Sequence, residues 1–255
     1  MSTSCPSGLT LALVAAAVAG APAGAQPDLA QSDLAPRLRL AYAAGDDDEL
    51  TRTARMGGAH ALMPLLAGQG LDVRIAILAA PAVDDSHALL ADLARLASEP
   101  DRVLAAPAAR AAVRIAGQLD GDHALTWDLG PADLAALVAP WRGVAADRGR
   151  PADVRVHAME ICARLAAARG LLVEAAAAPT AAPAMADGQV GFDLAAAVAD
   201  ADPEVRRAAF ELMPTPPPAA LRDLAVAAVL GEADPVVAVA AAQAACAELA
   251  EAGRA

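Results

Sequence analysis

Two adjacent arginines, Arg206 and Arg207, are the residues in this sequence whose types and spacing first suggest chemistry. They lie in the stretch DADPEVRRAAFELMP, after an acidic turn and a proline and before an apolar segment. Guanidinium groups bind carboxylates and phosphates in a bidentate way, so the pair could form an anion site. The alternative is structural, because acids at the start of a helix favour its positive end and could pair with an arginine in the next turn. The choice depends on whether the stretch recurs.

Other residues capable of chemistry are few. The histidines are His60, His87, His123 and His157. They form no HExxH motif and no i,i+4 pair, so we predict no metal site. The sequence has no lysine, no nucleotide-binding glycine fingerprint and no GxSxG nucleophile motif. We therefore expect a protein that is not an enzyme and that uses no cofactor.

The charge balance excludes some partners. The sequence has 31 acidic and 19 basic residues, for a net charge of −12. Proteins that bind nucleic acids need a basic face to neutralise phosphates, whereas the arginines here are dispersed among acids. We expect no nucleic-acid binding and no attraction to an anionic membrane surface. An acidic surface instead favours solubility or a protein partner with a basic patch.

The composition predicts an all-α fold. Apolar residues make up 57% of the sequence but aromatic residues only 2%, and alanine supplies most of the apolar count. Alanine has the highest helix propensity, and runs of β-branched residues are scarce. Small side chains also allow helices to pack closely, so we expect a core of alanine, leucine and valine.

Residues 1–25 read as a secretory signal peptide. They carry no charged side chain and include the apolar run LTLALVAAAV, which is too short to span a membrane. Small residues at Ala23 and Ala25 predict cleavage between Ala25 and Gln26. We therefore expect a periplasmic or secreted protein with no membrane insertion after cleavage. The alternative is an alanine-rich first helix of a cytoplasmic protein.

A valine–arginine step recurs in degenerate form near the start of several apolar segments. The copies are Val73-Arg74, Ala109-Arg110, Val154-Arg155, Val205-Arg206 and Val236-Val237, the last without the arginine. Each of the first four is followed by a second apolar-periodic segment, at 86–97, 131–141, 190–200 and 218–230. A helix–turn–helix unit that repeats every 31 to 51 residues indicates a helical solenoid.

The same pattern suggests the domain boundaries. We predict capping helices at 26–70, a repeat array at 71–251 and a short tail at 252–255. Two loop insertions, at 119–130 and 178–189, account for the longer spacings between copies.

The stretch DPEVRRAAFEL resembles the first helix of a HEAT repeat of the short bacterial type. The resemblance implies a right-handed solenoid of about five helical hairpins. In such repeats an arginine at this position usually pairs with an aspartate at a helix start, within or between repeats. The resemblance thus implies structural roles for Arg74, Arg110, Arg155 and Arg206, with the acids Asp72, Asp153 and Asp202. Arg207 is not explained in this way and stays a possible partner contact or an exposed surface residue.

Two further residue types bear on the prediction. Cys162 and Cys246 fall on helices two repeats apart, on the order of 20 Å, too far for a disulfide, so we predict free thiols. Trp127 lies in the first insertion, and tryptophan is frequent at binding hot spots. It is the second candidate for a partner contact; the alternative is a loop residue that folds back over the helix ends.

These patterns favour an exported, non-catalytic scaffold for protein–protein interactions, because a curved helical stack offers a broad binding surface. The alternative is a small-ligand carrier, or an enzyme-associated, lyase-like HEAT protein, with a pocket near one of the insertions. The sequence does not identify the protein partner.

Overall fold

The computed structural model describes residues 31–80, 86–99, 102–119, 129–176 and 191–252. These residues form α-helices and one short 3-10 turn, η1 (Ser86–Leu89), with no strand among them, so the predicted all-α class is confirmed. The helices are α1 (Gln31–Ala44), α2 (Asp47–Gly68), α3 (Leu71–Ala79), α4 (Leu90–Ser98), α5 (Arg102–Ala116), α7 (Pro131–Ala146), α8 (Ala152–Ala176), α9 (Leu194–Val198), α10 (Pro203–Glu211), α11 (Ala219–Gly231) and α12 (Pro235–Ala252).

Local sequence explains where the helices begin. Pro131 and Pro203 occupy the first helical turn, where the missing N–H has no intrahelical partner to lose. Aspartates precede other helices, and their carboxylates accept hydrogen bonds from the first free backbone N–H groups, as Asp46 does from Glu49 at 2.9 Å. Asp193 caps the short helix α9 in the same way, accepting from the N–H of Ala196 at 3.0 Å.

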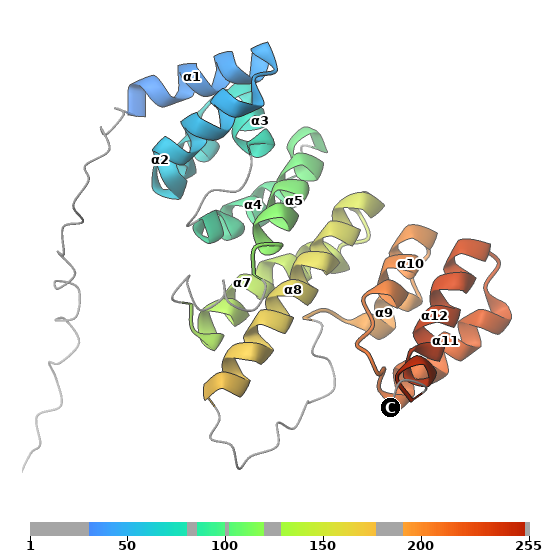
Figure 1. Ribbon diagram of the computed structural model, residues 1–255. Coiled ribbons are helices and arrows are strands. Elements are labelled where there is room, and N and C mark those ends of the chain that lie inside the picture. Colours follow the sequence, from blue (N-terminus) through green and yellow to red (C-terminus); the bar gives the residue numbers. More distant parts are fainter. Residues whose placement is uncertain (1–30, 81–85, 100–101, 120–128, 177–190, 253–255) are drawn as a thin grey trace, which may run out of the picture.

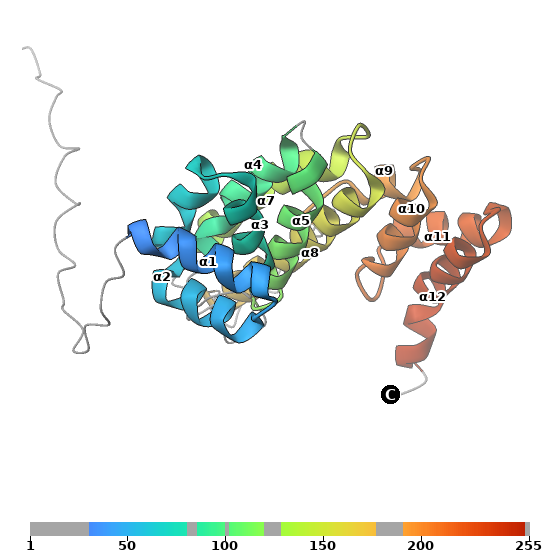
Figure 2. The same ribbon diagram turned by 90° about the horizontal axis from the view of Figure 1, so that it is seen from above.

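The helices pack as a row of hairpins. Helices that follow one another in sequence pair as α1 with α2, α4 with α5, α7 with α8, α9 with α10 and α11 with α12, and α3 contacts α1, α2 and α5. Figure 1 shows the pairs following one another from α1 at one end to α11 and α12 at the other, and Figure 2 shows the same order from above. Within each pair from α4 onward, the turn between the helices is short.

Two layers result from this stacking. Helices α1, α3, α5, α8, α10 and α12 contact one another in sequence and form one layer. Helices α4 and α7, and then α9 and α11, contact one another in the second layer. Helices α7 and α9 barely touch, so the second layer opens between them.

The predicted segments coincide with helices, but the close pairs are offset by one helix. We predicted a first helix, a turn and a second helix as the unit. The structure packs each second helix most closely against the next first helix, because their connection is the short one. The insertions at 119–130 and 178–189 separate the hairpins, and most of their residues lie outside the described ranges.

Small and aliphatic side chains fill the interior, as the composition predicted. Buried alanines line the contacts between layers, and the largest fully buried side chains include Trp141, Met159, Ile161 and Leu165. Cys162 is buried and Cys246 is exposed, and both are free thiols. Residues 1–30, with the predicted signal peptide, lie outside the described residues, and the right hand of the solenoid stays a prediction.

Candidate functional site

Arginine side chains connect successive hairpin turns, and we call this set of contacts the turn ladder. Each contact reaches from a first-layer helix, or from a turn, to the acid or the carbonyl groups at the end of a second-layer helix. The acids of the ladder are Glu99, Asp200 and Glu232. The ladder therefore lies along one edge of the stack, where the short turns are.

The central contact of the ladder is a buried ion pair between Arg155 on α8 and Asp200 after α9. Arg155 donates from Nη1 and Nη2 to the two carboxylate oxygens at 3.1 and 2.5 Å. Its Nε donates to the carbonyl of Ala145 at 3.1 Å, at the end of α7. The Asp200 carboxylate also accepts from the backbone N–H of Asp202 at 3.0 Å. With both side chains almost fully buried, these bonds satisfy polar groups that would be costly to bury unpaired.

The next contact along the ladder joins α10 to the last hairpin turn. Arg206 donates from Nε and Nη2 to the two oxygens of Glu232, both at 2.8 Å. Its Nη1 donates to the carbonyls of Asp200 and Ala201 at 2.9 and 3.0 Å. Arg206 therefore ties the turn before its own helix to the turn after α11.

The first contacts of the ladder are less regular. Arg74 on α3 reaches Glu99 through one long contact of 3.4 Å. Arg150, in the turn before α8, donates to the carbonyls of Ser98 and Glu99 and also pairs with Asp147 at 3.0 Å. Arg150 thus connects the C-terminal end of α4 to the C-terminal end of α7.

These contacts shift the pKa values of the acids. The hydrogen bonds from Arg155 hold the pKa of Asp200 below its ordinary value, against the opposing effect of burial. The hydrogen bonds from Arg206, with a backbone N–H, lower the pKa of Glu232 to about 2. Both carboxylates are therefore ionised at neutral pH, and the ladder consists of charged pairs.

The predicted acids lie elsewhere. Asp202 caps α10 and accepts from the N–H of Glu204 at 2.9 Å. Asp72 pairs with Arg39 on α1 at 2.5 Å, and Asp153 is exposed in the first turn of α8. The structure therefore pairs the repeat arginines with acids from the turn that follows, and not with the aspartates at their own helix starts.

The fourth residue of each first-layer helix marks the structural repeat. It is Arg74 in α3, Arg155 in α8 and Arg206 in α10, but Ala105 in α5 and Ala238 in α12. Arg110, which we had aligned with them, is exposed further along α5 and has no ion pair with a described residue. The preceding buried residue is Leu104 in α5 and Val237 in α12, which shifts both predicted alignments.

The two predicted partner contacts have different outcomes. Arg207 is half-exposed on α10 and lies 3.9 Å from Glu211, one turn further along the same helix. Trp127 lies outside the described residues. Arg207 therefore pairs within its own helix.

A sequence signal for the ladder acids existed. The turns before α5, α10 and α12 read Glu-Pro-Asp, Asp-Ala-Asp and Glu-Ala-Asp. In the last two, the aspartate caps the following helix and the acid two positions earlier accepts the arginine. The motif to search for was therefore acid-x-Asp before one first-layer helix, together with Val-Arg in the first-layer helix that precedes it.

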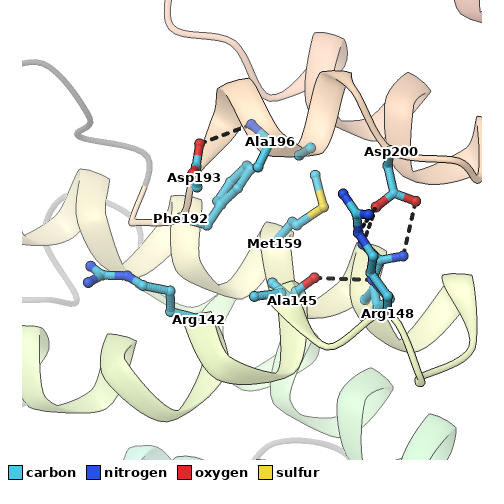
Figure 3. A pocket seen from close by; sticks show the side chains of 11 residues that line it. Arg142, Ala145, Arg148, Met159, Phe192, Asp193, Ala196 and Asp200 are labelled. Carbon is cyan, nitrogen blue, oxygen red and sulfur yellow. Dashed lines mark hydrogen bonds and ion pairs between the residues drawn. The ribbon is translucent and has the colours of Figure 1, made fainter.

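A pocket of about 290 Å³ lies where α7 and α9 diverge, with α8 as its third wall. Arg142 lies at one end of it and Arg148 and Asp200 at the other, with Met159 and Phe192 between them (Figure 3). The remaining lining residues are Ala145, Ala146, Arg155, Asp193, Ala196 and Ala197. The pocket follows the second predicted insertion, where the small-ligand hypothesis placed one. Sequence reasoning did not single out Arg142, Arg148 or Phe192.

The chain segment that enters α9 is fixed to α7 and α8 at Gly191. This glycine has φ of +77°, and a Cβ there would lie 2.7 Å from the backbone oxygen of Cys162. Arg142 Nε donates to the Gly191 carbonyl at 2.8 Å, and the next residue, Phe192, is buried. Glycine permits this close approach, which holds the pocket wall in place.

The last hairpin exposes apolar side chains, which we call the terminal apolar surface. It consists of Leu224, Val226, Val229 and Leu230 on α11 and Val236 and Val239 on α12. These are six of the ten large apolar side chains that are exposed in the described residues, so the exposure is concentrated at one end of the stack. No charged residue occurs in α12 from Pro235 to Ala247.

Three findings limit the kinds of site that the described residues contain. No three histidine, cysteine, aspartate or glutamate side chains among them are grouped so that they could hold a metal ion. None of the helices in the described ranges combines the length and apolarity needed to cross a bilayer. Burial raises the pKa of the Cys162 thiol to about 12, so this buried cysteine is a poor nucleophile.

Comparisons with known proteins give no match. No family model matches the chain, and no significant match was found among the curated proteins or the solved structures. The class that the fold defines is therefore an all-helical stack of hairpins joined by an arginine–acid ladder.

Proposed function

We propose that this protein is an exported, non-catalytic scaffold of the HEAT-like type, which binds a protein partner through the terminal apolar surface. The observation that carries this proposal is the exposure of six large apolar side chains on α11 and α12. Terminal repeats of a solenoid normally present a polar outer face, so a concentration of exposed apolar side chains on the last hairpin favours a bound partner.

The packing of α12 supports the proposal that a partner covers its exposed side. Its buried side chains, Val237, Ala240, Ala241 and Ala244, face the neighbouring helices. Val236 and Val239, which lie between them in sequence, are each more than half exposed. The outer side of α12 thus resembles in chemistry the inner side, against which α10 packs. A partner helix could continue the stack by the same kind of contact.

The chemistry of the surroundings suggests the kind of partner. The chain carries a net charge of −12, and Asp223 is exposed on α11 beside the apolar residues. An acidic partner would be repelled, whereas an amphipathic helix with basic residues beside its apolar stripe would be attracted. We therefore propose a helical protein partner with a basic patch.

Site-specific crosslinking in the native source tests this function. A photoreactive amino acid replaces Leu230 in one version of the protein and Leu40 in another. Both leucines are highly exposed, and they lie at opposite ends of the stack. We expect one protein, identified by mass spectrometry, to be crosslinked from position 230 and not from position 40.

A matched pair of variants completes the test. The Leu230→Glu variant should lose the captured partner, while Leu40→Glu should retain it. Capture that is equal from both positions, adducts only between copies of this chain, or no adduct at position 230 would contradict the proposal.

The second hypothesis, a small-ligand carrier, is favoured by a different observation, the pocket between α7, α8 and α9. It does not depend on the terminal apolar surface.

A further inference from the structure

The pocket between α7, α8 and α9 has a charge opposite to that of the chain. Three arginines and two aspartates line it, in a protein with a net charge of −12. One arginine, Arg155, is neutralised by its buried pair with Asp200. The other aspartate, Asp193, caps α9 and accepts from the N–H of Ala196 at 3.0 Å. The lining is therefore locally cationic and favours an anion over a cation.

Arg142 is the arginine best prepared to receive that anion. Its Nε is fixed by the Gly191 carbonyl at 2.8 Å, which orients the guanidinium plane. Among the described residues, no partner contacts its two Nη groups. At the other end of the pocket, the charge of Arg148 is already partly balanced by the Asp200 carboxylate, 3.8 Å away. Arg142 is exposed, and its guanidinium extends outward from the pocket in Figure 3, where its two Nη groups can pair with a carboxylate in a bidentate way.

The middle of the pocket is apolar. The side chains of Met159 and Phe192 lie between the two arginine ends, and alanines complete the wall (Figure 3). The volume of about 290 Å³ lies at the small end of the range of about 300–1,000 Å³ for ligand pockets. This space suits a small organic molecule.

We propose that this pocket binds a small organic carboxylate with an apolar body. The carboxylate pairs with Arg142, and the apolar body contacts Met159 and Phe192. This activity is separate from the scaffold function, because the residues that carry it lie on α7, α8 and the α9 segment and not on the last hairpin.

Calorimetric titration of the purified protein tests the proposal with defined probes. Benzoate and hexanoate supply a carboxylate on an aromatic and an aliphatic body, and benzamide is the neutral counterpart of benzoate. We expect saturable binding of one or both carboxylates at millimolar or lower concentration and at least about tenfold weaker binding of benzamide, because a hydrogen bond to a charged group is stronger than one to a neutral group. Equal binding of benzoate and benzamide, or no saturable binding of either carboxylate, would overturn the proposal.

Variants localise the binding. Arg142→Gln should raise the dissociation constant about tenfold or more, because the charged donor is lost. Arg164→Gln is the matched control, since Arg164 is exposed on α8 outside the pocket and pairs with Glu160 at 2.7 Å. That control should bind as the original protein does.

Because Arg142 also holds Gly191, a second variant separates binding from folding. Ala196→Phe fills the pocket from α9 without removing an arginine, and it should abolish binding while the thermal transition stays within a few degrees. Circular dichroism verifies the fold of each variant. Undiminished binding by both folded pocket variants, Arg142→Gln and Ala196→Phe, would show that the carboxylate binds elsewhere and would refute the assignment.

Discussion

The middle of the stack and its C-terminal end use the same arginine–acid contact in different surroundings. In the middle, Arg155 and Asp200 are only 7% and 4% exposed. At the end, Arg206 is 18% exposed and Glu232 is 9% exposed. The helices of the two regions differ in burial in the same way. Helix α7 buries the large side chain of Trp141 completely, whereas Ala225 is the one described residue of α11 that is fully buried.

The difference follows from the number of neighbours. A hairpin within the array has packed helices on both sides, so its polar contacts are removed from water. The last hairpin has them on one side, so its contacts remain near solvent. The same local sequence, acid-x-Asp before a helix that follows an upstream Val-Arg, therefore forms an almost fully buried contact in one place and a more exposed one in the other.

The largest effect should come from breaking the buried contact. Asp200→Ala leaves the Arg155 guanidinium buried without its carboxylate, and we expect a loss of about 3–5 kcal/mol in the free energy of unfolding. Glu232→Ala removes the equivalent acid at the end, where water can replace it, and should cost about 1–2 kcal/mol. Urea denaturation measures both values. Equal losses would contradict the distinction between the two regions.

The double variant Arg155→Met with Asp200→Leu provides the control. It replaces the buried ion pair with apolar side chains of similar size, and such replacements are often nearly neutral. We expect it to be clearly more stable than Asp200→Ala alone.

The second effect concerns the segment that joins α8 to α9. Gly191→Ala places a methyl group against the Cys162 carbonyl in a backbone conformation with positive φ, and should cost about 2–4 kcal/mol. Gly143→Ala is the comparison, because Gly143 lies in α7 with open space around it. It should leave stability unchanged or raise it by up to about 1 kcal/mol. Hydrogen exchange would show whether the loss at Gly191 is confined to α9 and α10.

Much of this fold could be predicted from local sequence. Alanine-rich periodic segments and caps such as Pro131 are short-range signals, so the helices appear where these signals do. The positions of Arg155 and Arg206 in the repeat were also evident. Aligning the repeats on the arginine alone was wrong in α5. We aligned Arg110 with the other repeat arginines, whereas Ala105 occupies the equivalent position in the structure.

The contacts of the site were harder to predict. The acid that pairs with Arg155 lies 45 residues further along the chain, and the one for Arg206 lies 26 residues further. The sequence spacing predicts that each arginine pairs with a nearby acid, such as Asp153 or Asp202. In the folded stack, the acid in the turn of the following hairpin lies closer to the arginine side chain. The pocket depends on the shortness of α9 and on the close approach at Gly191, and neither follows from periodicity.

A smaller effect should appear in acid. The pKa of Glu232 is about 2 in the folded protein and near 4.5 when the chain is unfolded. Because the folded value is the lower one, its stabilising contribution is complete above pH 4.5 and is lost as the pH falls from about 4.5 through about 2. Asp200 acts in the same direction.

The matched variant Glu232→Gln isolates this contribution. Its stability should depend less steeply on pH in that window than the stability of the original protein, as thermal unfolding at a series of pH values would show. A steeper dependence in the variant, or identical curves, would contradict the assigned pKa shift.

The smallest perturbation leaves the fold intact and compares the thiols of the two regions. Cys162 is buried in α8, where burial raises its pKa to about 12, and Cys246 is exposed on α12. A maleimide should modify Cys246 in the native protein, while Cys162 reacts only when the protein opens, because both access and the thiolate fraction are low there. Peptide mapping by mass spectrometry follows each site separately. If Cys162 reacts as fast as Cys246 under native conditions, the middle of the stack does not shield its interior from the reagent, and the contrast on which the larger predictions depend is wrong.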